Sequence, residues 1–384
     1  MARVRAGGQD ASVKQETRGI PLSSPYVGER EEELVLEVLR SGRLSLGPTI
    51  DRFEELFAAA TGAPYAAAVS SGTAGLHLLC VSAGIEAGDE VITTPYSFAA
   101  SANCFIYEGA VPVFADVNPQ TLNLDPAAVE ALVTERTKAI VAVDIFGYPC
   151  ELDELRAIAQ RHGLAFVQDS CEALGAEYKG APVGSHGPSA VFAFYPNKQI
   201  TTGEGGIVTT HSEEEWRLLR SLRNQGRGDE GGWLEHVRLG FNYRLDDVRA
   251  ALGIAQLEKL DEILCLRREV AARYGELLRD IDGVELPFPD DADHVRSWFV
   301  YVVKLPSRQA RERVIAHFER EGIGFNRYLP SIHLQPYMRK RYGFREGLCP
   351  VSEDASSRTL ALPFFTALER DAQERVTEAL ATAL

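Results

Sequence analysis

Residues 192–206 read Phe-Ala-Phe-Tyr-Pro-Asn-Lys-Gln-Ile-Thr-Thr-Gly-Glu-Gly-Gly. The apolar run over 190–195 predicts a buried strand, the Pro-Asn pair ends it, and the glycines lead into a second apolar run over 206–210. Lys198 therefore lies at the end of a buried strand, where a lysine is rarely found without a partner. A desolvated amine loses its proton more readily, and the neutral amine forms a Schiff base with a carbonyl. Lys198 is a candidate for covalent chemistry, and the alternative is a surface lysine in a turn.

The composition is that of a globular protein. The chain has 384 residues, of which 45% are hydrophobic and 25% charged, enough for about two or three domains. The net charge of −15 argues against nucleic-acid binding. No apolar run approaches the roughly 20 residues of a membrane span, and the N-terminus lacks an apolar signal core. The six cysteines include no Cys-x-x-Cys pair, so we expect no metal site, no disulfide framework and a cytoplasmic location.

Short apolar runs alternate with helical patterns through the first two thirds of the chain. Strands are expected over 91–94, 111–117, 139–145, 165–169, 190–195 and 206–210, and helices over 31–40, 49–60, 97–107, 125–134, 151–162 and 213–223. This alternation predicts an α/β fold with a largely parallel sheet covered on both faces. Ligands of such sheets bind at the carboxyl ends of the strands, where Thr73, Phe98, Asp169 and Lys198 would emerge. The glycine fingerprints of dinucleotide and P-loop sites are absent from the sequence.

The pattern divides the chain into three parts. Residues 1–19 are polar and lack periodicity, which predicts a flexible leader. Residues 20–257 are expected to form a large ligand-binding domain, and residues 258–384 a smaller C-terminal domain. A long amphipathic helix is expected to start at Gly240 and to continue to about Arg279. The other elements expected in the C-terminal part are a strand over 297–304 and helices over 310–321 and 370–384.

The segment Ser70-Ser-Gly-Thr73 follows an apolar strand and opens a helix. The amide groups of a helix start, a glycine that permits close approach, and the hydroxyls of Ser71 and Thr73 together suit a phosphate group. The alternative is a plain helix cap, because serine and threonine are preferred capping residues. His77 lies inside this helix and is expected to pack.

Asp169 ends the apolar run 164–168, so its carboxylate must be compensated. One interpretation is that it caps the following helix, a common role of aspartate at a junction of strand and helix. The functional interpretation is a counter-ion for a protonated pyridine nitrogen, which would keep the pyridine ring an electron sink.

Five motifs occur in one order along the chain. They are Ser71-Gly-Thr-Ala, Gly88-Asp-Glu-Val-Ile92, Asp169 with Glu172 and Ala173, Asn197-Lys198 with Thr202-Gly-Glu-Gly-Gly206, and Gly240-Phe-Asn-Tyr-Arg244. This order resembles the DegT/DnrJ/EryC1/StrS family of sugar aminotransferases, pyridoxal phosphate enzymes with the aspartate-aminotransferase-like fold, fold type I. The resemblance covers residues 20–384. It implies a large domain with a mostly parallel mixed sheet between helices, and a smaller C-terminal α/β domain.

The resemblance implies a role for each matching residue. Lys198 would hold pyridoxal 5'-phosphate covalently and later move protons, and Asp169 would pair with the pyridine nitrogen. Phe98 would stack on the ring, with Tyr96 as the other choice. The phosphate would be held at the helix start by Gly72, Thr73 and Ala74. Asn242 would reach the phosphate from the neighbouring subunit, which predicts a homodimer with shared sites.

Two residues depart from the pattern of many members of the family. Ala193 stands where many have a serine that touches the phosphate, and Glu172 stands where many have glutamine beside the phenolic oxygen of the cofactor. A carboxylate there would repel a phenolate, so Glu172 is either protonated, with a raised pKa, or turned toward another partner. Glutamate at this position is similar to perosamine synthases, which make a 4-amino-4,6-dideoxy sugar on GDP.

These features predict an aminotransferase that moves an amino group from glutamate to C4 of a nucleotide-linked 4-keto-6-deoxy sugar. Candidate substrate contacts are Tyr96, Arg244 and His333, although His333 fits a packed histidine equally well. Three segments are expected to shape the substrate pocket, namely 43–48, 225–239 and 328–337.

Three other functions remain open from the sequence. The first is amination at C3 of a keto-sugar, or of a cyclitol ketone. The second is the related 3-dehydratase chemistry, against which Lys198 counts because that branch resembles histidine at this position. The third is a non-catalytic regulator that senses pyridoxal phosphate, which would need a DNA-binding module that the sequence does not reveal.

Overall fold

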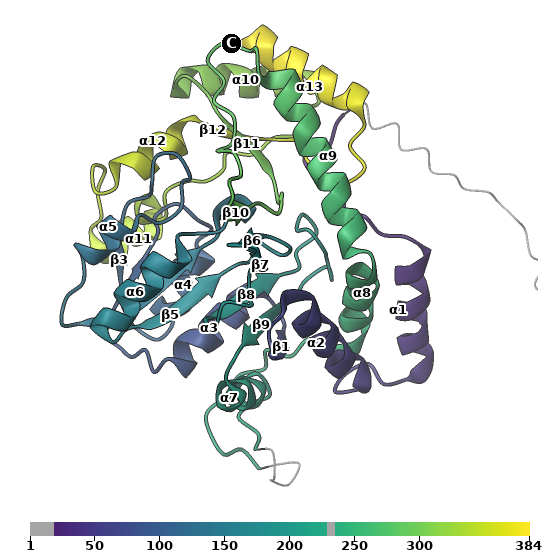
Figure 1. Ribbon diagram of the computed structural model, residues 1–384, viewed down its shortest axis with the longest axis vertical. Helices are drawn as coiled ribbons and strands as arrows, with labels where there is room; N and C mark the ends of the chain where they lie inside the picture. The colour runs from purple at the N-terminus through teal and green to yellow at the C-terminus, as the bar shows by residue number, and fades with distance from the viewer. Residues whose placement is uncertain (1–18, 229–234) are drawn as a thin grey trace, which may run out of the picture.

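The computed structural model describes residues 19–228 and 235–384. A seven-stranded sheet forms its centre, in the order β1-β9-β8-β5-β4-β2-β3 (Figure 1). The strands are β1 (Tyr65–Val69), β2 (Glu90–Thr93), β3 (Val111–Phe114), β4 (Thr137–Val143), β5 (Ala165–Asp169), β8 (Ser189–Ala193) and β9 (Gly206–Thr210). Neighbours pair in parallel except at β9, which runs antiparallel to β1 and β8. The predicted mostly parallel mixed sheet is confirmed.

Helices cover both faces of this sheet. Successive residues of a strand point to opposite faces of a sheet, so an apolar strand such as β1 needs a covering layer on each face. Ala66 and Ala68 enter the core under α2 and α8, whereas Ala67 and Val69 enter the core under α3. One face carries α2 (Pro48–Thr61), α6 (Leu152–His162) and α8 (Asp247–Glu258), and the other carries α3 (Gly72–Ser82), α4 (Ala100–Ile106) and α7 (Glu213–Arg223). Two further helices, α1 (Glu29–Ser41) and α5 (Pro126–Glu130), pack on α8 and α6 respectively.

The C-terminal part builds its own core around an antiparallel pair of strands. These strands are β11 (Tyr301–Lys304) and β12 (Thr359–Leu362), and the helices around them are α9 (Leu260–Leu278), α10 (Arg308–Glu321) and α13 (Arg370–Ala383). Ile20 joins this core and forms a bridge to Ile323, so the chain enters the C-terminal part before it builds the large sheet. The helices α8 and α9 are separated only at Lys259, close to the expected domain boundary.

The helix expected from Gly240 begins instead at Asp247. The side chain of Asp246 accepts a hydrogen bond from the Arg249 amide at 2.9 Å and thereby caps the helix start. The residues before it do not form a helix. Asn242 forms a β-bridge with Asn224, and Arg244 forms one with Val69 at the end of β1. The helical region covers residues 247–278, so the predicted helix start at Gly240 is wrong.

Shorter elements complete the described part of the chain. They are β6 (Glu177–Tyr178), β7 (Ala181–Pro182), β10 (His294–Val295), α11 (Pro336–Tyr342), α12 (Pro350–Arg358) and two 3-10 turns, η1 (Ile145–Gly147) and η2 (Ile332–Leu334). Within residues 19–228 and 235–384, no helix is both long and apolar enough to cross a bilayer. The expected leader lies outside the described residues apart from Gly19, as does the middle of the 225–239 segment.

The sheet topology brings four predicted residues to one edge. Asp169 is the last residue of β5, and Lys198 follows β8, its parallel neighbour. Thr73 lies just after β1, and Phe98 lies between β2 and α4. Because β1, β2, β5 and β8 all run in the same direction, these side chains leave the sheet at its carboxyl edge, as predicted.

Candidate active site

Lys198 is nearly enclosed by protein. Its Nζ lies 3.5 Å from Oε1 of Glu172 and 3.9 Å from the centre of the Phe299 ring. The side chains of Lys198 and Glu172 are only 13% and 12% exposed, so this pair is shielded from solvent. An amine held beside a carboxylate and an aromatic face, and reached by little water, is placed for chemistry rather than for solubility.

Glu172 is held from its other oxygen by the main chain. Oε2 accepts a hydrogen bond from the Phe146 amide at 2.8 Å. Burial raises the pKa of the Glu172 carboxyl above its ordinary value of 4.5, and the charge of Lys198 opposes that rise only in part. Both expected alternatives therefore hold together: the pKa is raised, and one oxygen is turned toward another partner.

Asp169 is buried at 4% exposure and receives only neutral hydrogen bonds. Its Oδ2 accepts from the Ser101 hydroxyl at 2.7 Å, and its Oδ1 accepts from the Cys171 amide at 3.2 Å. Ser101 is itself 2.7 Å from the Ser97 hydroxyl. In the described stretch after β5, the next element is the strand β6 and not a helix. The interpretation that Asp169 caps a following helix is therefore wrong. A buried carboxylate without an ion pair among the described residues suits a cationic group placed in the site.

The two aromatic candidates after β2 are placed very differently. The Phe98 side chain is exposed, at 68%, while Tyr96 is completely buried. The Tyr96 hydroxyl donates to the Tyr328 carbonyl at 2.8 Å and lies 2.9 Å from Oγ1 of Thr359. A substrate contact by Tyr96 would require its hydroxyl to leave these partners. Phe98 is the ring whose face is available.

The start of α3 offers a tight backbone surface. The Ser71 hydroxyl accepts from the Ala74 amide at 3.1 Å, so the capping interpretation holds for this residue. A Cβ at Gly72 would lie 2.8 Å from Cβ of Ala193 and 2.9 Å from Sγ of Cys171. Only glycine fits there, because the start of α3 packs directly against Ala193 of β8 and against Cys171. The start of a helix is also the end that suits an anion.

The segment carrying Asn242 lies beside this helix start. The Ser70 amide donates to the Tyr243 carbonyl at 2.7 Å, and Arg244 forms a bridge to Val69. Asn242 itself is exposed on the surface of the subunit. Its side chain is thus available to a second copy of the chain rather than buried within its own.

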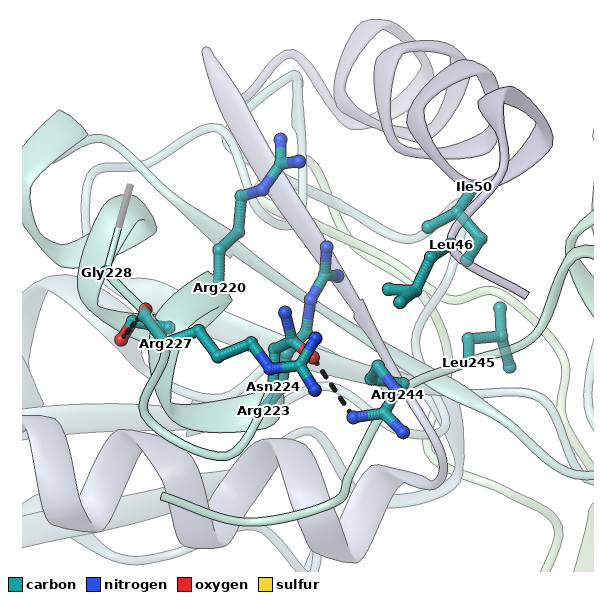
Figure 2. A pocket seen from close by; sticks show the side chains of 10 residues that line it. Leu46, Ile50, Arg220, Arg223, Asn224, Arg227, Gly228, Arg244 and Leu245 are labelled. Atoms are coloured by element: carbon teal, nitrogen blue, oxygen red, sulfur yellow. Dashed lines mark hydrogen bonds between the residues drawn. The ribbon is translucent and has the colours of Figure 1, made fainter. Parts of the chain in front are cut away.

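An arginine pocket lies next to that segment (Figure 2). Its volume is about 150 Å³, and its residues come from the start of α2, the end of α7 and the chain before α8. They are Leu46, Ile50, Arg220, Ser221, Arg223, Asn224, Arg227, Gly228, Arg244 and Leu245. The Arg244 guanidinium donates to Oδ1 of Asn224 at 3.0 Å. Burial, and then the neighbouring charges of Arg227 and Arg223, lower the pKa of Arg244.

Carboxylates offset only part of this positive charge. Arg223 is paired with the buried Glu54, and Arg220 lies 3.1 Å from Asp51 and 3.8 Å from Glu54. Arg244 has no carboxylate within ion-pair distance among the described residues. The arginine pocket is therefore suited to an anionic group from a ligand.

His333 takes the packed position. It is completely buried, its Nε2 lies 2.9 Å from Oε1 of Glu353, and its ring contacts Phe114. The structure does not bring it to the arginine pocket, whose lining residues do not include it. Of the three expected substrate contacts, Arg244 lines the arginine pocket, whereas Tyr96 and His333 do not.

Several residues at the site were not predicted. Ser101 could have been found, because Ser97 and Ser101 are spaced by one helical turn behind a strand. Phe299 and the arginines of α7 carry no such signal, since their places depend on segments far apart in the sequence. Within the described ranges, no group of three or more histidine, cysteine or acidic side chains is placed to hold a metal ion.

The fold and the lysine site together define the class, an aminotransferase of fold type I. Residues 25–381 match the DegT/DnrJ/EryC1/StrS aminotransferase family, and the chain belongs to that family. The predicted family and the enzyme class, a transaminase, are thereby confirmed.

Similar proteins extend over almost the whole chain. The spore coat polysaccharide biosynthesis protein SpsC of Bacillus subtilis (strain 168) is 38% identical over 381 residues, which cover 96% of this chain and 98% of SpsC. The crystal structure of S. venezuelae DesV in complex with ketimine intermediate has a TM-score of 0.87 at 34% identity and covers 92% of this chain and 93% of DesV. Helicobacter pylori PseC, an aminotransferase involved in the biosynthesis of pseudoaminic acid, has a TM-score of 0.89 at 28% identity and covers 95% and 99%.

Members of the family depend on pyridoxal phosphate, and three features of this site fit that group. The start of α3, capped by Ser71, lies after β1 at the carboxyl edge of the sheet, and Phe98 presents an exposed ring at the same edge. Asp169 is a buried carboxylate whose described hydrogen-bond donors are all neutral. Ala193, which lies next to Gly72, offers no hydroxyl to a phosphate.

Proposed function

We propose that this chain binds pyridoxal phosphate and transfers an amino group from glutamate to C4 of a nucleotide-linked 4-keto-6-deoxy sugar. The observation that carries the proposal is the shielded pair of Lys198 and Glu172 at the carboxyl edge of the sheet, 3.5 Å apart. Lys198 would attach the cofactor, and Asp169 would pair with its ring nitrogen. Phe98 would stack on the ring, and Gly72, Thr73 and Ala74 would hold the phosphate.

The lysine is the proton carrier in this proposal. When bound, pyridoxal phosphate supplies an electron sink for the carbon that gains or loses the amino group. The amine of Lys198 would take the proton from the α-carbon of the donor and would return a proton on the acceptor side. Phe299 and Glu172 would keep that amine close to the reacting atoms, because they leave it little room to turn into solvent. The carboxylate of Asp169 would favour a positive charge on the ring nitrogen.

The arginine pocket supports an anionic substrate. Nucleotide-linked sugars carry a diphosphate, and planar guanidinium groups bind phosphate oxygens through paired hydrogen bonds. Arg244 is the least compensated of these cations among the described residues. The α-carboxylate of glutamate is also an anion, so the same pocket suits a donor carboxylate as well.

Glu172 supports amination at C4 over the other reactions that the sequence leaves open. Perosamine synthases resemble this chain in having glutamate at this position. The Glu172 carboxyl lies 3.5 Å from Nζ of Lys198. The similarity to SpsC, a spore coat polysaccharide biosynthesis protein, supports a role in polysaccharide biosynthesis. Membership of an aminotransferase family favours an enzyme over a regulator.

The test begins with the purified chain and pyridoxal phosphate, whose visible absorbance is recorded before and after addition of glutamate. A band that appears with the cofactor and bleaches with glutamate is expected. Panels of GDP-, dTDP- and UDP-linked 4-keto-6-deoxyhexoses then identify the acceptor, and NMR of the product locates the new amine.

Each outcome has a definite meaning. A 4-amino product supports the proposal, and a 3-amino product replaces C4 by C3. A cofactor band that glutamate leaves unchanged excludes glutamate as donor. If no band forms at all, the proposed cofactor role of Lys198 is wrong.

A further inference from the structure

A second groove lies away from the arginine pocket, between the large sheet and the C-terminal part. Its volume is about 380 Å³, within the ~300–1,000 Å³ typical of small-molecule sites. One wall is made by the loops 119–122 and 145–146, which follow β3 and β4. The other is made by 285–289, with Arg296 and Lys304 beside it. Two parts of the fold thus meet around an open space.

Most of the groove wall is apolar. Leu122, Phe146, Leu286 and Phe288 line it, together with three prolines of the same loops. Such a surface holds the hydrocarbon or aromatic body of a ligand, because burying apolar area is favourable. It does not by itself say which ligand.

Arg296 gives the groove its charge. It is 5% exposed, one guanidinium nitrogen donates to the Phe288 carbonyl at 3.0 Å, and Nε is buried without a hydrogen-bond partner among the described residues. The guanidinium lies between two rings, 4.9 Å from the centre of Tyr148 and 4.8 Å from that of Trp298. Burial lowers the pKa of Arg296 to about 10, and the charge of Asp290 opposes this only in part.

Lys304 is paired with a carboxylate at the groove, and Asp290 acts on Arg296 only from beyond ion-pair distance. Lys304 lies 3.3 Å from Glu285, whereas Arg296 has no carboxylate within 4.0 Å in the described part of the chain. A buried cation without an ion pair is costly, so a site that keeps one is suited to an anion from outside.

We propose that this groove binds a small molecule with an apolar body and one anionic group, a carboxylate or a phosphate, that reaches Arg296. The apolar walls hold the body, and the guanidinium supplies a charge-assisted hydrogen bond to the anion. The groove shares Phe146 with the active site, because the amide of that residue holds Glu172 while its side chain lines the groove. An occupant would therefore contact the residue that positions the partner of Lys198.

The test uses the full chain loaded with pyridoxal phosphate, so that the phosphate-binding start of α3 is already filled. The probes are 2-naphthoate, 2-naphthyl phosphate and the neutral 2-naphthamide, and calorimetry measures their dissociation constants. At least one acid should bind about tenfold or more tightly than the amide, as expected for a charged hydrogen bond. The stronger of the two acids shows whether the site prefers carboxylate or phosphate.

Three variants make the result specific. Arg296→Met should remove the preference for the acids, and Leu286→Trp, which fills the groove, should abolish binding of all three probes. Leu348→Trp adds the same ring at an exposed position and should leave binding unchanged. Because Arg296 is buried and its variant can unfold, the half-buried Leu286 gives an independent test. Equal binding of acid and amide, binding that survives Leu286→Trp, or no binding of any probe would each overturn the proposal.

Discussion

The amine of Lys198 lies between the Glu172 carboxyl and the ring of Phe299, with little access to water. Burial raises the pKa of the Glu172 carboxyl above its ordinary value, and the charge of Lys198 and the Phe146 amide oppose that rise. The state of this single pair decides whether the site holds a reactive lysine.

Replacing Lys198 tests this directly. We expect Lys198→Ala to lower single-turnover formation of 2-oxoglutarate from glutamate by about 10³-fold or more, because general acid-base and covalent catalysis are both lost. Lys179→Ala is the matched control, since Lys179 is an exposed lysine paired with Asp153. Purified Lys198→Ala that keeps the rate of the unaltered chain would contradict the assigned role.

Glu172 makes a second prediction, on pH. Its pKa in the folded chain lies above the ordinary 4.5, so the folded state keeps a proton that the unfolded state releases as the pH rises past 4.5. The contribution of the Glu172 carboxyl to the free energy of unfolding therefore falls as the pH rises from 4.5 through the raised pKa of the folded chain. The glutamine side chain of Glu172→Gln does not titrate in this range. The variant should therefore gain stability relative to the unaltered chain as the pH is raised from 4.5 to neutral.

Urea unfolding of both proteins across this range measures the difference. The gap between their free energies of unfolding should widen in favour of Glu172→Gln as the pH rises. A gap that stays constant, or that narrows, would show that Lys198 and the Phe146 amide compensate the carboxylate fully.

Among the elements, α3 depends on the absence of a side chain at its first residue. A Cβ at Gly72 would press on Ala193 and Cys171, both at less than 3.0 Å. We expect Gly72→Ala to destabilise the chain by about 1–3 kcal/mol, as overpacking does, and to weaken binding of pyridoxal phosphate. Urea unfolding and cofactor titration measure the two effects.

The control for this variant lies in another helix. A Cβ at Gly275 in α9 would lie 4.0 Å from the Tyr301 hydroxyl, at ordinary van der Waals distance. Gly275→Ala should therefore stabilise the helix by about 0.5–1 kcal/mol. If Gly72→Ala is as stable as Gly275→Ala and binds pyridoxal phosphate with the same affinity, the start of α3 does not require a glycine at residue 72.

The end of α7 and the chain before α8 together form the arginine pocket. Arg244→Gln should raise the KM for the nucleotide-linked sugar about tenfold or more, because a charged hydrogen bond to the substrate is lost. Arg217→Gln serves as the control, since Arg217 lies on α7 and bonds to Glu213 at 2.7 Å on the exposed side. Steady-state kinetics with the identified acceptor distinguish the two, and an unchanged KM in Arg244→Gln would remove this pocket from the substrate site.

At the scale of the whole molecule, the family resemblance predicts that Asn242 serves a site shared between two subunits, and the exposure of Asn242 leaves it accessible to a second copy of the chain. Mixing inactive Lys198→Ala with weakened Asn242→Ala subunits tests this. In a mixed dimer one site would combine an intact Lys198 with an intact Asn242 from the partner, whereas no site is intact if both residues serve their own subunit.

Refolding the two variants together should therefore restore about a quarter of the original activity, since about half of randomly formed dimers are mixed and each has one intact site. Activity of the mixture is compared with that of each variant refolded alone. Recovery no greater than the sum of the separate variants would place Asn242 in its own subunit's site.

The sequence alone carried much of this fold. Alternating apolar runs and helical patterns predicted the central strands to within a few residues, because burial on a pleated strand or a helix face repeats at a fixed spacing. The run 165–169 coincides with β5, and 206–210 with β9. The start of α8 was missed, because the extended segment through Asn242 is held by β1 and Asn224, which are distant in sequence.

The short strand β12 was also not predicted. Its four residues are too few for a periodic signal, and only the pairing of Thr359 with Lys304 on β11 makes them a strand. The boundary between a large and a small domain remains a prediction, although α8 and α9 separate at Lys259. The N-terminal Ile20 lies in the C-terminal core, a connection that no local pattern contains.

The aminotransferase class was predicted from five motifs whose order resembles the family, and the pattern of strands placed Lys198 and Asp169 at one edge of a parallel sheet. Only the tertiary structure decided which ring is exposed there, Phe98 or Tyr96, and that His333 is packed against Glu353. It alone gathered the arginines of α7 with Arg244. The physical reason is that strand and helix patterns depend on nearby residues, whereas exposure and charge compensation depend on which distant segments pack against a side chain.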